Sequence, residues 1–180
     1  MRGDAMGGLK GVFRTKSLWV WEKWSPVNPR SGAYLLTDRW EATNLTTDEG
    51  INHALDVVFS GGAQKTAWYI ALFEDDYTPL STNTYQVPGY TECTAYDEGA
   101  RPTWEEGGVS AKSISNTANS ATFTMNAAKT LYGASLVSAN TKGDIVSGEV
   151  LYLSTAFSAE KNMADDEVLR VTATITGQDV

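Results

Sequence analysis

The chain has 180 residues, 42% of them hydrophobic, and a formal net charge of −8. This length and composition predict one globular domain that can bury a core without disulfides. No apolar run approaches the ~20 residues that span a bilayer, so we expect no membrane partner. The single cysteine, Cys93, excludes an intramolecular disulfide and a multi-cysteine zinc site.

The first part of the chain differs from the rest in charge. Residues 1–40 carry seven Lys or Arg and three Asp or Glu, whereas residues 41–180 carry seven and nineteen. This asymmetry predicts a basic N-terminal arm, residues 1–40, that leads into an acidic body, residues 41–180. The basic residues do not cluster on a recognisable helix, and the acidic body would repel phosphate. We therefore expect a protein partner and no direct contact with nucleic acid.

Four of the six tryptophans also lie in residues 1–40. Trp19 and Trp21 alternate with Val20 and Glu22, which is the period-2 pattern of a strand with one aromatic face. The strand could be buried in the same domain, or it could belong to an extended arm that packs on a neighbouring subunit. The arm interpretation predicts an interface formed by Arg14, Lys16, Trp19, Trp21 and Trp24. Residues 25–32, which contain two prolines, then predict a turn-rich connector.

A short helix is predicted next. Thr46 and Glu49 have the spacing of a capping box, which predicts that the helix begins at Thr46. Gly61 and Gly62 predict its end, because glycine tolerates the left-handed C-terminal cap. One buried stripe is expected from three residues at i, i+4 and i+7: Ile51, Leu55 and Val58.

Strands are predicted at roughly ten-residue intervals beyond this helix, with turn signals between them. They are expected at 66–73, 85–87, 90–96, 101–105, 109–115, 121–125, 131–138, 149–157 and 168–176. The segments 109–115 and 121–125 predict a hairpin around a polar turn, and alternate residues of the last strand (Leu169, Val171, Ala173, Ile175) are expected to share a face. The predicted fold class is mainly β: an antiparallel, jelly-roll-like β-sandwich with one short helix and an extended N-terminal segment.

Residues that carry chemistry are few. The only histidine, His53, lies in the predicted helix and cannot build a zinc site alone. Glu105 and Glu106 are adjacent, so on a strand they would point to opposite faces, unlike the opposed carboxylates of a glycosidase. The acidic clusters at 74–76 and 165–167 lack the alternating ligand pattern of a calcium loop. We therefore expect no enzyme, no catalytic residue, no cofactor and no metal.

Framework segments across residues 40–180 form a further pattern. They are N-L-T-T-D-E-G-I-N-H-A-L-D-V (44–57), S-G-G (60–62), T-A-W-Y-I-A-L-F (66–73), Y-T-P-L (77–80), T-A-Y-D-E-G-A-R-P-T-W (94–104), A-T-F-T-M-N-A-A-K-T-L-Y-G-A-S-L (121–136) and L-R-V-T-A-T-I-T (169–176). This pattern resembles a family of tailed-bacteriophage virion structural proteins, which are small β-rich accessory proteins. The resemblance rests on framework residues, so it implies a class of protein and no mechanism.

The resemblance implies a non-enzymatic protein of the virion, assembled in the host cytoplasm. One hypothesis is a capsid decoration or cement protein that stabilises the head through contacts with the major capsid protein or other virion proteins. Such a protein is expected to be a homo-oligomer, with a trimer favoured, whose residues 1–40 reach a neighbour or the shell. Another is a tail, neck or fibre-associated structural protein. A third is a carbohydrate-binding β module, suggested by the six Trp and eight Tyr residues.

Overall fold

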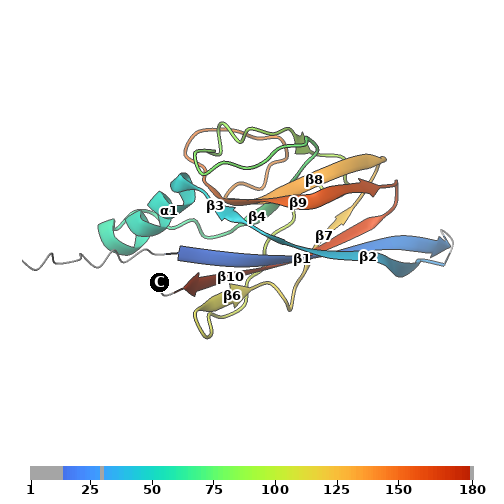
Figure 1. Cartoon of the computed structure of the whole chain (residues 1–180), viewed down its shortest axis with the longest axis horizontal. Helices are drawn as coiled ribbons and strands as arrows, with labels where there is room; N and C mark the ends of the chain where they lie inside the picture. The colour runs from blue at the N-terminus through green and yellow to red at the C-terminus, as the bar shows by residue number, and fades with distance from the viewer. Residues whose placement is uncertain (1–13, 29–30, 179–180) are drawn as a thin grey trace, which may run out of the picture.

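The computed structural model describes residues 14–28 and 31–178. The protein is 48% strand and 8% helix, and two antiparallel sheets pack face to face (Figure 1). These proportions confirm the predicted fold class, a mainly β sandwich with antiparallel sheets and one short α-helix.

Among the described residues, each sheet contains five strands. In the first sheet the order is β2-β1-β10-β6, and β7 also pairs with β10; in the second it is β3-β9-β8-β4-β5. The first sheet consists of β1 (Arg14–Asn28), β2 (Ala33–Thr43), β6 (Ser113–Ser115), β7 (Ala121–Thr124) and β10 (Val168–Gln178). The second consists of β3 (Leu45–Thr46), β4 (Tyr69–Phe73), β5 (Glu92–Cys93), β8 (Lys129–Val137) and β9 (Leu151–Met163). The chain passes from one sheet to the other at Asn44, whose side-chain oxygen accepts the backbone N–H of Ser17 at 3.1 Å.

The core between the sheets is built around tryptophan. Trp19 and Trp21 of β1 are fully buried, and their rings stack at 5.3 Å between centroids. Trp21 also stacks on Trp40 of β2 at 6.2 Å and meets the edge of Phe157 of β9 at 4.9 Å. Because a buried aromatic side chain removes about 150–250 Å² from water, these rings supply a large part of the packing between the sheets.

The predicted division at residue 40 is corrected for the part of the arm that the structure describes. β1 is an inner strand that pairs with β2 on one side and with β10 on the other, and position 40 falls inside β2. Residues 14–28 and 33–40 thus belong to two strands of the first sheet, and residues 1–13 lie outside the described residues. The predicted connector is also displaced, because Pro26 still belongs to β1, next to an irregularity in the pairing with β2.

The helix begins one residue later than predicted. α1 (Asp48–Leu55) is capped by Thr47, whose Oγ1 accepts the N–H of Gly50 at 2.9 Å. Thr46 does not serve as the cap because it belongs to β3, where it pairs with Leu153 of β9. The Glu49 carboxylate accepts the N–H of Tyr85 and of Leu151 at 2.9 and 2.7 Å, so it ties the helix to two other segments and does not close a capping box.

The predicted buried stripe is wrong. Leu55 is 43% exposed and Val58 is 69% exposed, while Ile51 is half-buried. The helix packs against β9 through its first turn, at Gly50, and the rest of it projects beyond the end of the sandwich (Figure 1). After α1 the chain forms a π-helical segment, η1 (Asp56–Ser60), and it ends at Gly61 with φ of 74°, as the glycine signal predicted.

The predicted hairpin of 109–115 with 121–125 is also wrong. β6 and β7 do not pair with each other, and both pair with β10, one after the other along the same strand. Asn116 explains the difference, since it is fully buried and its amide bonds the backbone of β10 at Val171 O (3.1 Å) and Ala173 N (2.7 Å). These bonds hold the chain alongside β10 where a hairpin would turn away from it.

The later strands follow the prediction more closely. In β10, Leu169, Val171 and Ala173 are buried on one face, which confirms the predicted alternation. Between β4 and β6, however, loops replace most of the predicted strands. The strand there is β5, and isolated bridges form at Tyr96, Thr103 and Ser110.

Candidate functional site

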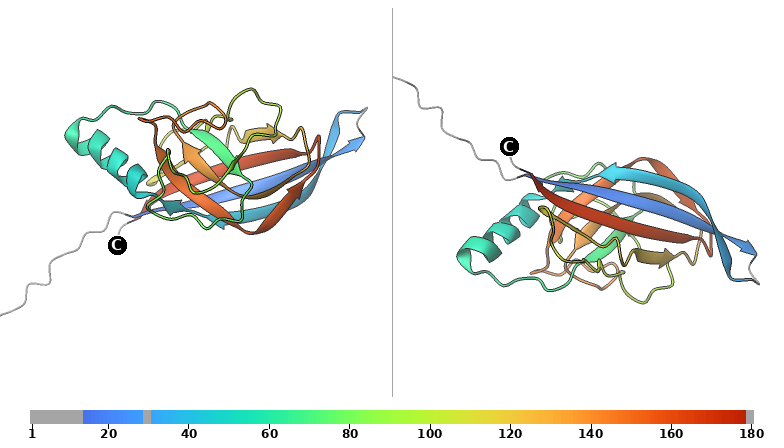
Figure 2. Two further views of the ribbon diagram at one scale, coloured as in Figure 1. Left: turned by 90° about the horizontal axis from the view of Figure 1, so that it is seen from above. Right: turned by 90° about the horizontal axis from the view of Figure 1, so that it is seen from below.

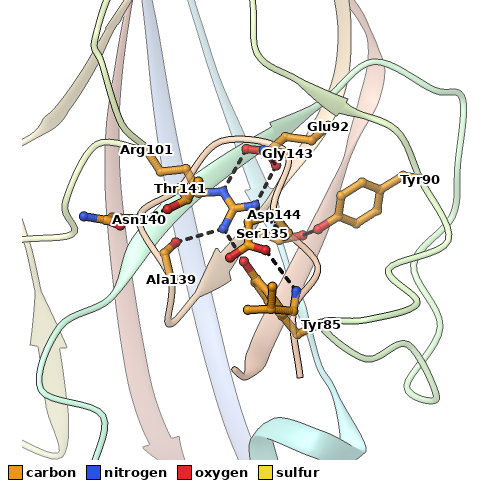
Figure 3. Close-up of polar contacts among 11 residues, drawn as sticks. Tyr85, Tyr90, Glu92, Arg101, Ser135, Ala139, Asn140, Thr141, Gly143 and Asp144 are labelled. Carbon is orange, nitrogen blue, oxygen red and sulfur yellow. Dashed lines mark hydrogen bonds and ion pairs between the residues drawn. The ribbon is translucent and has the colours of Figure 1, made fainter. Parts of the chain in front are cut away.

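A buried arginine joins several of these loops. Arg101 is 4% exposed, and its guanidinium binds the Glu92 carboxylate of β5 through two parallel hydrogen bonds, Nε to Oε1 at 2.8 Å and NH2 to Oε2 at 2.6 Å (Figure 3). It also donates to the Tyr85 hydroxyl at 2.7 Å and to the carbonyl oxygens of Ala139 at 2.8 Å and Asp144 at 3.1 Å.

This arrangement satisfies the arginine completely. A guanidinium has five N–H donors, and the five bonds just described use all of them. Glu92 Oε2 also accepts the backbone N–H of Gly143 at 2.8 Å. No donor is left for an anionic ligand, so the guanidinium serves to connect the loops.

The pKa values at this centre agree with a structural role. Burial alone would lower the pKa of Arg101, but the hydrogen bonds and the charge of Glu92 outweigh it and raise that pKa. Burial raises the pKa of Tyr85 despite its bond from Arg101. Burial likewise raises the pKa of Tyr90, whose hydroxyl donates to Ser135 at 2.7 Å. Both phenols thus stay protonated near neutral pH, and neither is poised as a base. A cavity of about 240 Å³ lies beside the cluster.

The five residues predicted to form an interface differ in burial and in surroundings. Trp19 and Trp21 are core residues of this chain, so their prediction as interface anchors is wrong. Trp24 is half-buried, with the guanidinium of Arg170 4.8 Å from its ring centre. Lys16 is exposed on β1, and the side chain of Arg14 lies outside the described residues. The structure therefore does not bring these five residues together as one surface.

One exposed apolar surface lies on the hairpin of β1 and β2. The last residue of β1 that pairs with β10 is Trp24, so beyond it the hairpin has two strands only and extends past the sandwich (Figures 1 and 2). Its exposed apolar side chains are Val27, Tyr34, Leu35 and Leu36, with Val27 64% and Leu35 61% exposed. Leu35 and Leu36 are consecutive, so they lie on opposite faces of the ribbon.

The base of this hairpin is held firmly. The carboxylate of Glu167 accepts hydrogen bonds from Lys23 Nζ at 2.8 Å and from Ser25 Oγ at 2.5 Å. Burial alone would raise the pKa of Glu167, but these bonds outweigh it and lower that pKa. On β2, Asp38 pairs with Lys161 of β9 at 2.8 Å, and this hydrogen bond lowers the pKa of Asp38. The tip thus projects from a fixed base.

The sequence contained one signal for this surface that the prediction missed. Two consecutive leucines cannot both face the core of a half-buried strand, so Leu35-Leu36 requires one apolar side chain to point outward. The Arg101–Glu92 pair has no such signal, because nothing in the local sequence specifies which carboxylate an arginine meets.

His53 and two residues of the predicted acidic clusters have partners within the chain. The ring of His53 meets the edge of Trp68, with 5.9 Å between centroids. In the predicted acidic clusters, Glu74 pairs with Lys129 at 2.7 Å and Glu167 with Lys23. Within the described ranges, no three His, Cys, Asp or Glu side chains come together as a metal site. No helix in that part of the chain is long and apolar enough to cross a membrane.

Comparison of the chain with models of known protein families and with curated proteins gave no match.

Proposed function

We propose that the protein is a non-enzymatic structural protein of a tailed-bacteriophage virion, and specifically a decoration or cement protein that binds the capsid through protein–protein contacts. The class comes from the resemblance of residues 40–180 to virion structural proteins. A location in the tail, neck or fibres is the alternative, and a trimer remains the favoured oligomer.

The observation that carries the proposal is the projecting β1–β2 hairpin. Its tip exposes apolar side chains on both faces, and the outer edge of β2 has no paired strand among the described residues. An exposed, apolar edge strand promotes aggregation unless a partner covers it. A capsid surface that adds a strand to β2, or that buries Leu35 and Leu36, would be such a partner.

The tryptophans do not favour the carbohydrate-binding hypothesis. Trp19, Trp21, Trp40 and Trp104 are buried, and the other two, Trp24 and Trp68, are half-buried. Stacking on sugars needs several exposed ring faces on one surface, and these six rings do not provide it.

Leu35→Lys tests the hairpin directly. The tip makes no core contact, so the variant is expected to keep the melting temperature of the parent within about 2 °C. Its binding to particles that lack the protein should fall at least about tenfold, because a charge would be buried at the interface. The control is Val109→Lys, on a loop residue that is 74% exposed, and it should bind like the parent. Equal binding of both variants would rule out the hairpin as the docking element.

Copy number separates head from tail. Quantitative mass spectrometry of purified particles, with the major capsid protein as internal standard, measures the number of copies of this protein per particle. A decoration protein should be present in a number comparable to that of the capsid subunits. A few copies per particle would favour the tail or neck, and absence from the particle would refute a virion role.

A further inference from the structure

Two residues on the outer edge of β2, Arg39 and Glu41, turn their backbone groups away from β1. The N–H of Ser17 in β1 points to the β2 side, where it donates to Asn44 Oδ1 at 3.1 Å. Backbone direction alternates along a strand, so the other odd-numbered residues of this part of β1 also point towards β2. Between positions 38 and 43 of β2, these odd-numbered residues pair with even-numbered ones, such as Trp40. The N–H and C=O of Arg39 and Glu41 therefore face the outer edge.

Thr43 supports the same direction. Its carbonyl oxygen accepts the hydroxyl of Thr155 at 2.9 Å, and Thr155 belongs to the other sheet, so this carbonyl does not point to β1. Among the described residues, no backbone hydrogen bond joins Arg39 or Glu41 to a segment beyond this edge. The N–H of Arg39 bonds the neighbouring carboxylate of Asp38. The edge therefore lacks a strand partner at these positions.

The side chains at this edge are accessible. Arg39 and Glu41 are 52% and 50% exposed, and they form an ion pair at 3.5 Å on the outward face of the sheet. The even-numbered Trp40 and Ala42 face the core. β2 runs along the open side of the first sheet (Figures 1 and 2). An exposed strand edge of this kind is a template for pairing with another chain.

The order of the charges makes this edge complementary to itself. Two copies of β2 can pair antiparallel about a twofold axis. If both cores lie on the same side of the joined sheet, the axis passes through one residue, since paired side chains must share a face. An axis at Trp40 places Arg39 opposite Glu41 of the second copy, and the reverse. An axis at Asp38, Arg39 or Glu41 would place that charge opposite itself, which is destabilising.

We propose that a second copy of this chain occupies the edge of β2, paired antiparallel about a twofold axis at Trp40. Each pair of Arg39 with Glu41 of the other copy exchanges two backbone hydrogen bonds, and the side chains form a cluster of alternating charge. The inference does not rest on the proposed virion function, because it uses the middle of β2 and not the exposed tip of the hairpin. It predicts a dimer where the resemblance favours a trimer.

Charge reversal tests the register. In sedimentation velocity over a concentration series, the parent should form a dimer. Glu41→Arg should raise the dissociation constant of the dimer about tenfold, because opposite-charge pairs become like-charge pairs. The double variant Arg39→Glu/Glu41→Arg should return to the parent value, since the reversed charges are again complementary. The control is Glu106→Arg, the same change at an exposed loop residue away from β2, and it should dimerise like the parent.

Hydrogen exchange locates the contact at a single amide. The N–H of Glu41 should exchange about tenfold more slowly in the dimer than in the dilute monomer. The N–H of Trp40, which bonds β1 in both states, is the matched control and should not change. All variants should keep the melting temperature of the parent, because the substituted side chains are exposed.

Several results would overturn the proposal. A parent that stays monomeric at every concentration, or that forms a trimer, would exclude the twofold contact. A double variant that dimerises no better than Glu41→Arg would exclude the register. Equal exchange of the Glu41 amide in monomer and dimer would place the interface elsewhere on the molecule.

Discussion

Arg101 shows how a buried charge can serve the fold alone. Its five donors hold a carboxylate of β5, a phenol of the loop before it and two backbone carbonyls of the loop between β8 and β9. A buried ion pair of this kind stabilises little over an apolar replacement, but it specifies which loops meet. The long segment between β4 and β6 contains little regular structure, so the specification matters most there.

Arg101→Ala is expected to destabilise the protein by about 3–5 kcal/mol, because it leaves the largely buried Glu92 carboxylate without its counter-charge. For a chain of this size the loss corresponds to a fall of about 6–20 °C in melting temperature. Differential scanning calorimetry measures the fall.

Lys65→Ala is the matched control for that experiment. The Lys65–Glu149 pair has a similar distance, 3.0 Å, but both side chains are 27% exposed. Water screens such a pair, so the variant should lose less than about 1 kcal/mol. Equal losses in the two variants would show that burial does not distinguish the pairs.

At the scale of elements, the sequence predicted what local patterns determine. The alternation in β10 and the glycine end of the helix were correct because each depends on a few neighbouring residues. The start of the helix was wrong by one residue because β3 takes Thr46, and the hairpin of β6 with β7 was wrong because Asn116 bonds to β10. Both errors arise from contacts with strands more than fifty residues away.

Gly50→Ala is expected to cause a steric clash in the first turn of α1. A Cβ there would overlap the carbonyl oxygen of Tyr152 and lie 2.7 Å from its Cα, both of them backbone atoms. Alanine gains about 1 kcal/mol of helix propensity over glycine. The helix would have to move, however, and would strain the cap at Thr47 and the bonds of Glu49, so the net loss should be about 1–3 kcal/mol.

The control for Gly50→Ala is Asn52→Ala, on the exposed side of the same helix. It gains propensity without a clash and should be neutral or slightly stabilising. Chemical denaturation monitored by circular dichroism compares the two variants. Stabilisation by Gly50→Ala would mean that the helix does not pack on β9 through this residue.

For the whole molecule, the tryptophan-rich segment decides whether the chain forms one body or a body with an arm. Alternation at Trp19 and Trp21 predicts a strand with one aromatic face, but a strand in an arm and a strand in a core have the same pattern. The structure assigns it through β10, which pairs with β1 along eleven residues at the other end of the chain. A pairing between the two ends of a chain leaves no local signal, so the sequence could identify the strand and not its partner.

Deletion of residues 1–30 is therefore expected to abolish folding. It removes the strand between β2 and β10 and takes Trp19 and Trp21 out of the core. Loss of two buried tryptophans costs roughly 6–10 kcal/mol, which is comparable to the entire stability of a typical domain, about 5–15 kcal/mol. Deletion of residues 1–8 is the control, since it leaves both sheets intact and should preserve a cooperative thermal transition. Near-ultraviolet circular dichroism and calorimetry distinguish the two results. A cooperative transition in the larger deletion would restore the arm interpretation, because only a separable arm can be removed without loss of the core.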